Sequence, residues 1–223
     1  MNLDLNRIYH HRFDGISPRN KQATWQEIAH WILRDAQSLR GGNAIHRILD
    51  PACGDGEFLN ACPQGMISLT GCDLRERSPL LTAKATFHQG MFQSLELDQK
   101  FDLIWISNLL EHLRSAEEIQ DFLIHCRQNL SPNGLIVIMG PNIKYCSSDY
   151  WDFADHILPL SHLTVIEHLI SADLRITAVN KKFLPYSFRS RLPADPRLVR
   201  LYLNNSWAWN LLGKQFLIRA QIP

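Results

Sequence analysis

The chain has 223 residues and a mass of 25.7 kDa, with 45% apolar, 20% charged and 9% aromatic residues. This is globular composition, which excludes an intrinsically disordered or fibrous protein, and the length suits one domain over residues 1–223. The 23 Lys and Arg residues balance 22 Asp and Glu residues to a net charge of +1, so the chain has no overall attraction to nucleic acid or to a membrane surface.

The first part of the chain predicts a long helix followed by a strand, a tight turn and a short helix. Residues 1–21 are polar and are expected to form an irregular or short helical lead-in. From Thr24 to Ala36, apolar residues recur at offsets of three and four, which predicts a helix that ends at Gly41-Gly42. A strand at 45–50 then leads into a glycine-bearing turn at 51–56 and a helix that begins at 57.

Strands alternate with helical stretches in the middle of the chain. Strands are predicted at 67–73, 85–88 and 101–106. The segment 115–118 fits a capping box, and the helix behind it carries one apolar stripe. A turn is expected at 131–134. The apolar run that follows, Leu135–Met139, is typical of a parallel strand covered on both faces, so the pattern predicts βαβ units.

The sequence changes character after Gly140. Residues 141–160 are expected to form an aromatic loop, followed by a helix with apolar residues from Leu163 to Ile170. A sixth strand is predicted at 174–183 and a final strand at 215–220. The connection 185–212 is expected to carry helices, from Leu198 to Leu203 at least, because connections of that length usually hold structure or function of their own.

The cysteines and the apolar runs predict a soluble cytoplasmic protein. The cysteine count is five, and no Cys-x-x-Cys pair occurs, so neither a disulfide framework nor a structural zinc site is expected. The N-terminus lacks the basic start and apolar stretch of a signal peptide. The longest clean apolar run is five residues, whereas a membrane-spanning helix needs about 20.

The strongest functional signal is a strand, the turn Asp50-Pro51-Ala52-Cys53-Gly54-Asp55-Gly56, and a helix. Glycines in such a turn let the backbone approach a ligand closely. Asp73 lies 19 residues after Gly54, at the end of the second strand, where a carboxylate can accept hydrogen bonds from both hydroxyls of a ribose. The pair predicts a nucleoside site. Leu59 replaces the third glycine of a dinucleotide turn, which counts against NAD.

At this point the chain resembles the class I S-adenosylmethionine-dependent methyltransferases, above all over residues 46–140. Four segments match the family's motifs in order: Asp50-x-Ala52-x-Gly54-x-Gly56, Gly71-Cys72-Asp73-Leu74, Phe101–Leu113 with its Glu-His-Leu tail, and Leu130-Ser131-Pro132-Asn133-Gly134. The later part is similar to bacterial members often found with glycan or surface-polysaccharide biosynthesis.

The resemblance implies S-adenosylmethionine as the cofactor and an α/β, Rossmann-like fold. Its sheet would have seven strands, mostly parallel with an antiparallel last strand, and helices on both faces. Residues 1–40 would form an N-terminal helical cap, 46–140 the cofactor-binding core, and 141–223 the substrate-side cap and last strands. Tyr9, Arg12 and Phe13 are expected to close over the cofactor.

The resemblance also implies roles by position for residues along the ends of the strands. Asp50 and Gly54 would border the methionine end of the cofactor, in a turn completed by Gly56 and by Ala52, which stands in place of the usual first glycine. Asp73 would hold the ribose. Leu74 would pack against adenine, and Gln89 and Met91 would line its edge. Asn108 and Leu109 would lie beneath the sulfonium and border the substrate.

A histidine beside the sulfonium would serve as a base if the acceptor is a hydroxyl, because its proton exchanges near neutral pH. His156, which follows Asp155 in the aromatic loop, is the first candidate, and a structural role in fixing that loop is the alternative. His112, after the fourth strand, is the second candidate, with a packing role as its alternative. No histidine–carboxylate set has metal-ligand spacing, so no metal is predicted.

The acceptor is expected to be a small molecule or glycan, most plausibly methylated at oxygen. Ser107-Asn108-Leu109-Leu110 differs from the Asn/Asp-Pro-Pro-aromatic motif of amino-directed methyltransferases. The segment 181–200 carries a local charge of +5, which favours an anionic acceptor or is a solvated face. The aromatic residues of 145–153 form either an acceptor wall or cap packing. Three alternatives stay open: an NAD-type oxidoreductase, a non-catalytic S-adenosylmethionine-binding module, and an RNA methyltransferase.

Overall fold

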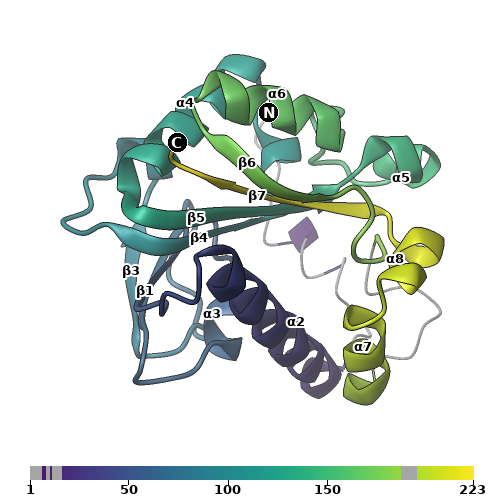
Figure 1. Ribbon diagram of the computed structural model, residues 1–223, viewed down its shortest axis with the longest axis horizontal. Coiled ribbons are helices and arrows are strands. Elements are labelled where there is room, and N and C mark those ends of the chain that lie inside the picture. Colours follow the sequence, from purple (N-terminus) through teal and green to yellow (C-terminus); the bar gives the residue numbers. More distant parts are fainter. Residues whose placement is uncertain (1–6, 9–10, 12–16, 187–194) are drawn as a thin grey trace.

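The computed structural model describes residues 7–8, 11, 17–186 and 195–223, and it contains one seven-stranded sheet (Figure 1). The strand order is β3-β2-β1-β4-β5-β7-β6. The first five strands in the chain run parallel, and β7 is antiparallel to both β5 and β6. This confirms the expected fold class. The strands are β1 (Arg47–Asp50), β2 (Ser68–Asp73), β3 (Ala85–Gln89), β4 (Phe101–Ser107), β5 (Leu130–Pro141), β6 (Arg175–Asn180) and β7 (Gln215–Gln221).

Helices cover both faces of the sheet (Figure 1). On one face lie α2 (Pro18–Leu39), α3 (Glu57–Ala61) and α7 (Pro196–Leu203), and on the other lie α4 (Ala116–Asn129) and α6 (His162–Ser171). Near the carboxyl end of β5 lie α5 (Ile143–Tyr150) and α8 (Ser206–Leu212). Two short 3-10 turns, η1 (Phe92–Ser94) and η2 (Leu110–His112), follow β3 and β4.

The central strands are apolar because both of their faces are buried. In β4, Trp105 belongs to the core beneath α2 and α3, while its neighbours Ile104 and Ile106 belong to the core beneath α4 and α6. The ring of Trp105 stacks on Phe58 of α3 with ring centroids 4.5 Å apart. Burying one large apolar side chain stabilises the folded state by about 1.5–3 kcal/mol. The two cores together therefore fix the positions of the strand ends.

The helix predicted from Thr24 begins earlier, at Pro18, inside the expected lead-in. Ser17 caps its N-terminus by accepting a hydrogen bond from the Asn20 N–H, and Pro18 occupies the first turn. Proline fits there because the first helical N–H groups have no partner within the helix. The predicted end is confirmed, since Gly41 and Gly42 both adopt positive φ values, 68° and 86°.

Three segments differ from the sequence prediction. The residues of the expected turn at 131–134 lie inside β5, as an irregularity in its pairing with β4. Between the pairs Phe101↔Leu130 and Leu103↔Leu135, β5 has three more residues than β4. The expected loop after Gly140 contains the helix α5, whose N-cap Asn142 accepts from the Lys144 N–H. The sixth strand is shorter than predicted. The described part of the connection 185–212 carries α7 and α8, which confirms the expectation of helices there.

Within the described ranges, none of the helices combines the length and the hydropathy that crossing a lipid bilayer requires.

Candidate functional site

The turn between β1 and α3 has the backbone geometry that its glycines predict. Gly54 and Gly56 have φ values of 55° and 80°, in the left-handed region where a β-carbon is strained. A β-carbon on Gly56 would lie 2.4 Å from Cδ1 of Leu81, so this glycine also permits close packing. The helix behind the turn, α3, has only five residues, so it adds a weaker dipole than a long helix.

Asp73 meets this turn at the end of β2, as predicted from the spacing. Its Oδ2 accepts a hydrogen bond from the Gly54 N–H at 2.8 Å, and its Oδ1 accepts from the Arg75 N–H at 2.9 Å. The Arg75 guanidinium lies beside the same Oδ1 at 3.3 Å. Arg75 was not among the residues predicted for the site. Its position two residues after the acid was the available signal, because residues after a strand-end Asp often turn back to bond its carboxylate.

Asp50 lies under the turn and is almost fully buried. Its Oδ1 accepts from the Ala52 N–H at 3.2 Å. The pKa of Asp50 is raised to about 8, mainly by burial and to a smaller extent by the nearby carboxylates of Glu57 and Asp73. The carboxyl group is therefore mostly protonated at neutral pH in the free protein, although it lies where the resemblance places the methionine end of the cofactor.

Exposed apolar side chains follow the second and third strands. Leu74 is 62% exposed and Met91 is 46% exposed, each beside a strand end. Gln89 is exposed and pairs in register with Asp73 across β2 and β3, and the Gly90 N–H donates to the Asp73 carbonyl at 2.9 Å. An exposed leucine and methionine flanking polar groups suit a flat heteroaromatic ring, because a bound ring would cover both.

The end of β4 turns sharply at Asn108. This residue has a φ of 48°, which asparagine tolerates better than most residues, and its N–H donates to the Met139 carbonyl of β5 at 2.9 Å. The side chain of Asn108 is exposed, and Leu109 is half-buried at the start of η2. The residues expected beside the sulfonium therefore lie at the carboxyl edge of the sheet, between β4 and β5.

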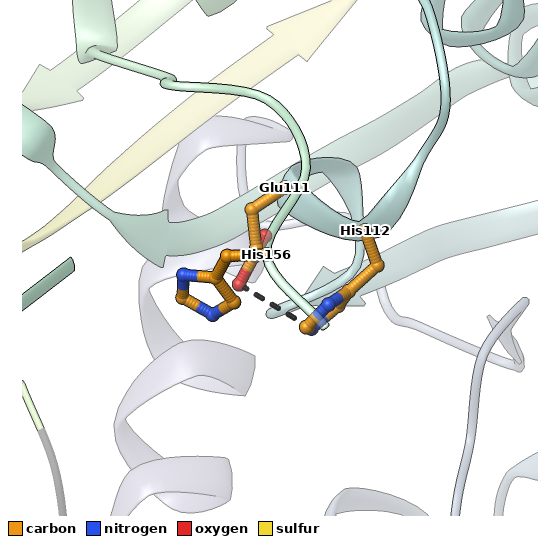
Figure 2. A group of neighbouring side chains, drawn as sticks. All are labelled: Glu111, His112 and His156. Carbon is orange, nitrogen blue, oxygen red and sulfur yellow. Dashed lines mark ion pairs between the residues drawn. The ribbon is translucent and has the colours of Figure 1, made fainter. Parts of the chain in front are cut away.

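The two candidate histidines lie side by side at this edge (Figure 2). The ring centroids of His112, on η2, and His156, on the loop between α5 and α6, are 5.0 Å apart. The buried carboxylate of Glu111 lies between them, with its Oε1 4.0 Å from Nε2 of His112. Glu111 was not predicted as a site residue, although it stands next to His112, because nothing in the sequence shows that its side chain turns inward.

Both the carbonyl and the carboxylate of Asp155 lie close to His112. Nδ1 of His112 lies 2.7 Å from the Asp155 carbonyl oxygen and 3.6 Å from its carboxylate. A carbonyl oxygen only accepts, so Nδ1 of His112 carries the proton and Nε2 of the neutral ring keeps a lone pair. The tautomer of the neutral His112 ring is thus inferred from the partner of its Nδ1.

The loop that carries His156 is held by its own aromatic residues and by η2. The Glu111 carbonyl accepts from the N–H groups of Ile157 and Leu158, at 2.8 and 3.1 Å. The buried hydroxyl of Tyr150 donates to the Leu158 carbonyl at 2.6 Å and accepts from the Leu160 N–H at 3.1 Å. Tyr150 is thus part of the cap packing. Trp151, by contrast, is 54% exposed.

The basic segment 181–200 is partly used within the protein. The guanidinium of Arg200 on α7 binds both carboxylate oxygens of Glu27 on α2, at 2.6 and 2.8 Å. Lys182 donates to the Asn210 carbonyl at 2.8 Å, and its ammonium lies 4.6 Å from the ring centroid of Tyr145. Lys181 and Arg197 are exposed. Two further basic residues of the segment and the expected lid residues lie outside the described residues: Arg189, Arg191, Tyr9, Arg12 and Phe13.

The sheet order and the turn facing a strand-end acid define a nucleoside-binding α/β protein. The chain belongs to the methyltransferase domain family, whose model matches residues 10–177. It is an S-adenosylmethionine-dependent methyltransferase of class I, as the resemblance implied. This match rules out the alternative that the chain is an NAD-type oxidoreductase. Among the curated proteins, none matches this chain.

Solved structures of methyltransferases share the fold over nearly the whole chain. An S-adenosylmethionine-dependent methyltransferase from Archaeoglobus fulgidus is 22% identical, with a TM-score of 0.65 and coverage of 97% of this chain and 99% of that one. The plantazolicin methyltransferase BpumL, solved with a triazolic analogue and S-adenosylhomocysteine, is 17% identical, with a TM-score of 0.69 and coverage of 100% and 92%. The N-methyltransferase NodS from Bradyrhizobium japonicum is 18% identical, with a TM-score of 0.62 and coverage of 95% and 91%.

Proposed function

We propose that the protein methylates a hydroxyl oxygen of a small-molecule or glycan-type acceptor and that the His112–His156 pair takes up the proton. The observation that carries the proposal is the contact between these two rings at the carboxyl edge of β4 and β5, directly after the turn at Asn108. Ligands of open α/β sheets bind at this edge.

The residues along the strand ends fit S-adenosylmethionine. Asp73 holds the ribose in this proposal, because a carboxylate offers about four acceptor positions and retains capacity beside its bonds to Gly54 and Arg75. Leu74 and Met91 cover the adenine, with Gln89 at its edge. Asp50, Ala52, Gly54 and Gly56 surround the methionine end, and Asn108 and Leu109 border the transferred methyl group.

The chemistry asks mainly for alignment and a proton acceptor. The bound cofactor supplies a methyl group on a sulfonium, and the leaving group is the neutral thioether. The protein then has to hold the acceptor oxygen in line and keep water out. A hydroxyl is a better nucleophile as its proton leaves, and a positioned histidine that accepts the proton raises the reaction rate about 10²–10⁴-fold.

The contacts favour His112 over His156 as that base. The Asp155 carbonyl fixes the proton on Nδ1 of His112, which leaves Nε2 to accept the acceptor's proton, and the nearby Asp155 carboxylate stabilises the imidazolium that forms. His156 packs against His112, Phe153 and Tyr150, with ring centroids 4.9–5.1 Å apart. In this proposal His156 shapes the acceptor side of the pair.

The surrounding residues support a polar, sugar-like acceptor. Exposed Trp151 and half-buried Phe153 lie on the loop that carries His156, and aromatic faces of this kind stack on sugar rings. Lys181 is exposed beyond β6 and favours an anionic group on the acceptor. The cap segments 1–40 and 141–212 would cover the site.

The test measures cofactor binding and methyl transfer separately. S-adenosylhomocysteine at 100 times its Kd stabilises the protein by about 2.7 kcal/mol, roughly 5–10 °C in Tm for this length, and the shift shrinks in Asp73→Ala. Transfer from labelled S-adenosylmethionine is then measured on a panel of neutral and anionic sugars.

His112→Gln is expected to lower kcat about 10²–10⁴-fold and keep the S-adenosylhomocysteine shift, while His30→Ala on the exposed side of α2 changes neither. Equal kcat values for His112→Gln and wild type would refute the assignment of His112 as the base. Binding with no transfer to any acceptor would favour the non-catalytic module, and transfer to RNA alone would favour the RNA methyltransferase.

A further inference from the structure

We infer that Glu111, His112 and His156 form a binding site for a divalent transition-metal cation, for which Zn²⁺ is the natural probe. One ligand atom from each residue lies within 4.8 Å of the other two, so the fold brings the imidazole of His156 to the adjacent residues Glu111 and His112, which lie more than 40 positions earlier in the chain (Figure 2). The inference goes beyond the proposed function, because cation binding does not depend on the identity of the acceptor.

The separations are close to those of a bound ion. Zinc bonds to histidine nitrogen and carboxylate oxygen are about 2.0–2.2 Å long, so two ligand atoms of one tetrahedral ion lie about 3.4 Å apart. The Glu111 Oε1 to His112 Nε2 distance, 4.0 Å, exceeds this separation by only about 0.6 Å. Closing the set from its 4.8 Å span asks for side-chain shifts of under about 1 Å, which small χ rotations supply.

The hydrogen bonding of His112 is the independent second observation. Histidines that bind metals almost always donate their other ring N–H to a carbonyl or carboxylate, which fixes the tautomer and the ring orientation. His112 does this through Nδ1, 2.7 Å from the Asp155 carbonyl oxygen and 3.6 Å from the Asp155 carboxylate. The lone pair of Nε2 then faces the side of Glu111, where the cation would lie.

The carboxylate of Glu111 is placed to attract a cation. The residue is 2% exposed, and low-dielectric surroundings strengthen the attraction between a carboxylate and a positive ion. Its Oε2 lies over Gly140 at the end of β5, where an added β-carbon would be 3.6 Å away. The Glu111 side chain therefore lies against the carboxyl end of β5.

The backbone holds the three ligands in one unit. The Glu111 carbonyl accepts from the N–H groups of Ile157 and Leu158, so the loop segment that carries His156 is tied to the residue that supplies the carboxylate. The ordering of the loop is therefore completed before any ion binds, which lowers the cost of closing the site.

The donor set selects the class of metal. Two imidazole nitrogens and one carboxylate suit Zn²⁺, Co²⁺ or Ni²⁺, whereas Mg²⁺ and Ca²⁺ prefer oxygen ligands alone. Three protein ligands leave one position of a tetrahedral ion open to water or to an acceptor hydroxyl, whose pKa the ion would lower. An ion bound here would use the Nε2 lone pair of His112, so it would replace the imidazole in activating the hydroxyl.

Calorimetry of chelator-treated full-length protein with ZnCl₂ tests the site, and Co²⁺ absorption reports the ligand geometry. The wild type is expected to bind one ion per chain, and Glu111→Gln, His112→Ala and His156→Ala are each expected to bind at least 10-fold more weakly. His30→Ala and His88→Ala serve as matched controls with unchanged affinity. The S-adenosylhomocysteine thermal shift, retained in each variant, shows that the variants are folded.

Equal Zn²⁺ affinity in wild type and in all three site variants, or no binding by the wild type, would overturn the inference. Methyl transfer in the same samples tests the proposed function by itself. Transfer that persists in chelator and is inhibited by Zn²⁺ supports the free His112 imidazole as the base, and transfer that requires Zn²⁺ contradicts it.

Discussion

The buried carboxyl group of Asp50 makes the stability of the protein depend on pH. Its pKa is about 8 in the folded chain and about 3.9 in the unfolded chain. Between these values the folded state holds a proton that the unfolded state has released, so the free energy of unfolding falls as pH rises, by about 1.4 kcal/mol per pH unit. The contribution of this group is therefore fully present below pH 4 and is lost progressively toward pH 8.

Asp50→Asn removes this titration and keeps an oxygen that can accept from the Ala52 N–H. From pH 5 to pH 7 the stability of the variant is expected to rise relative to wild type by about 2.7 kcal/mol, which is roughly 5–10 °C in Tm. Thermal unfolding followed by circular dichroism at pH 5, 6 and 7 measures the difference. Asp98→Asn, at an exposed position, is the control for the loss of one negative charge.

Parallel pH profiles for wild type and Asp50→Asn would refute the reasoning, because they would mean that Asp50 is ionised throughout. A wild type that loses stability faster than the variant as pH rises supports it. The same group is proposed to border the positively charged methionine end of the cofactor, which would favour the ionised form and release a proton on binding.

Two further substitutions test the packing of the site. Gly56→Ala combines a φ of 80° with a β-carbon 2.4 Å from Leu81 Cδ1, and it should lower the free energy of unfolding in urea by at least about 2 kcal/mol. Gly54→Ala would meet only the ends of the Arg75 and Glu57 side chains and should lower it less, so equal losses would contradict the packing argument. Tyr150→Phe removes the hydroxyl that bonds the Leu158 carbonyl and the Leu160 N–H. It should lower the free energy of unfolding in the same assay by about 1–3 kcal/mol, because both backbone groups lose their partner. A loss below about 0.5 kcal/mol would show that these groups find other partners.

The parts of the site that depend on local spacing could be predicted from the sequence. Gly54 and Asp73 are 19 residues apart, and one βα unit of that length brings a strand-end acid to the preceding turn; the structure shows the resulting hydrogen bond at 2.8 Å. The strand number and the antiparallel last strand followed from the resemblance, whereas the order of the strands was not predicted, because alternating strands and helices alone leave it open.

The contacts around the histidines could not be predicted, because they depend on how a loop folds back onto the sheet. Asp155 adjoins His156 in the sequence, yet its carbonyl and carboxylate lie against His112. The side chain of Glu111 turns into the protein because η2 is a single turn held against the loop by the Glu111 carbonyl. Long-range backbone hydrogen bonds of this kind leave no periodic signal in the residues that they position.

The strand β7 is synthesised after every other strand of the described chain, yet it lies inside the sheet between β5 and β6. Until it leaves the ribosome, β5 presents an open edge and β6 lacks the strand with which it pairs. The cofactor-side residues, contributed by β1 to β4 and the turns after them, emerge well before that moment. Folding during synthesis therefore builds the nucleoside half of the enzyme first, and the nascent chain stays prone to edge pairing until its last strand closes the sheet.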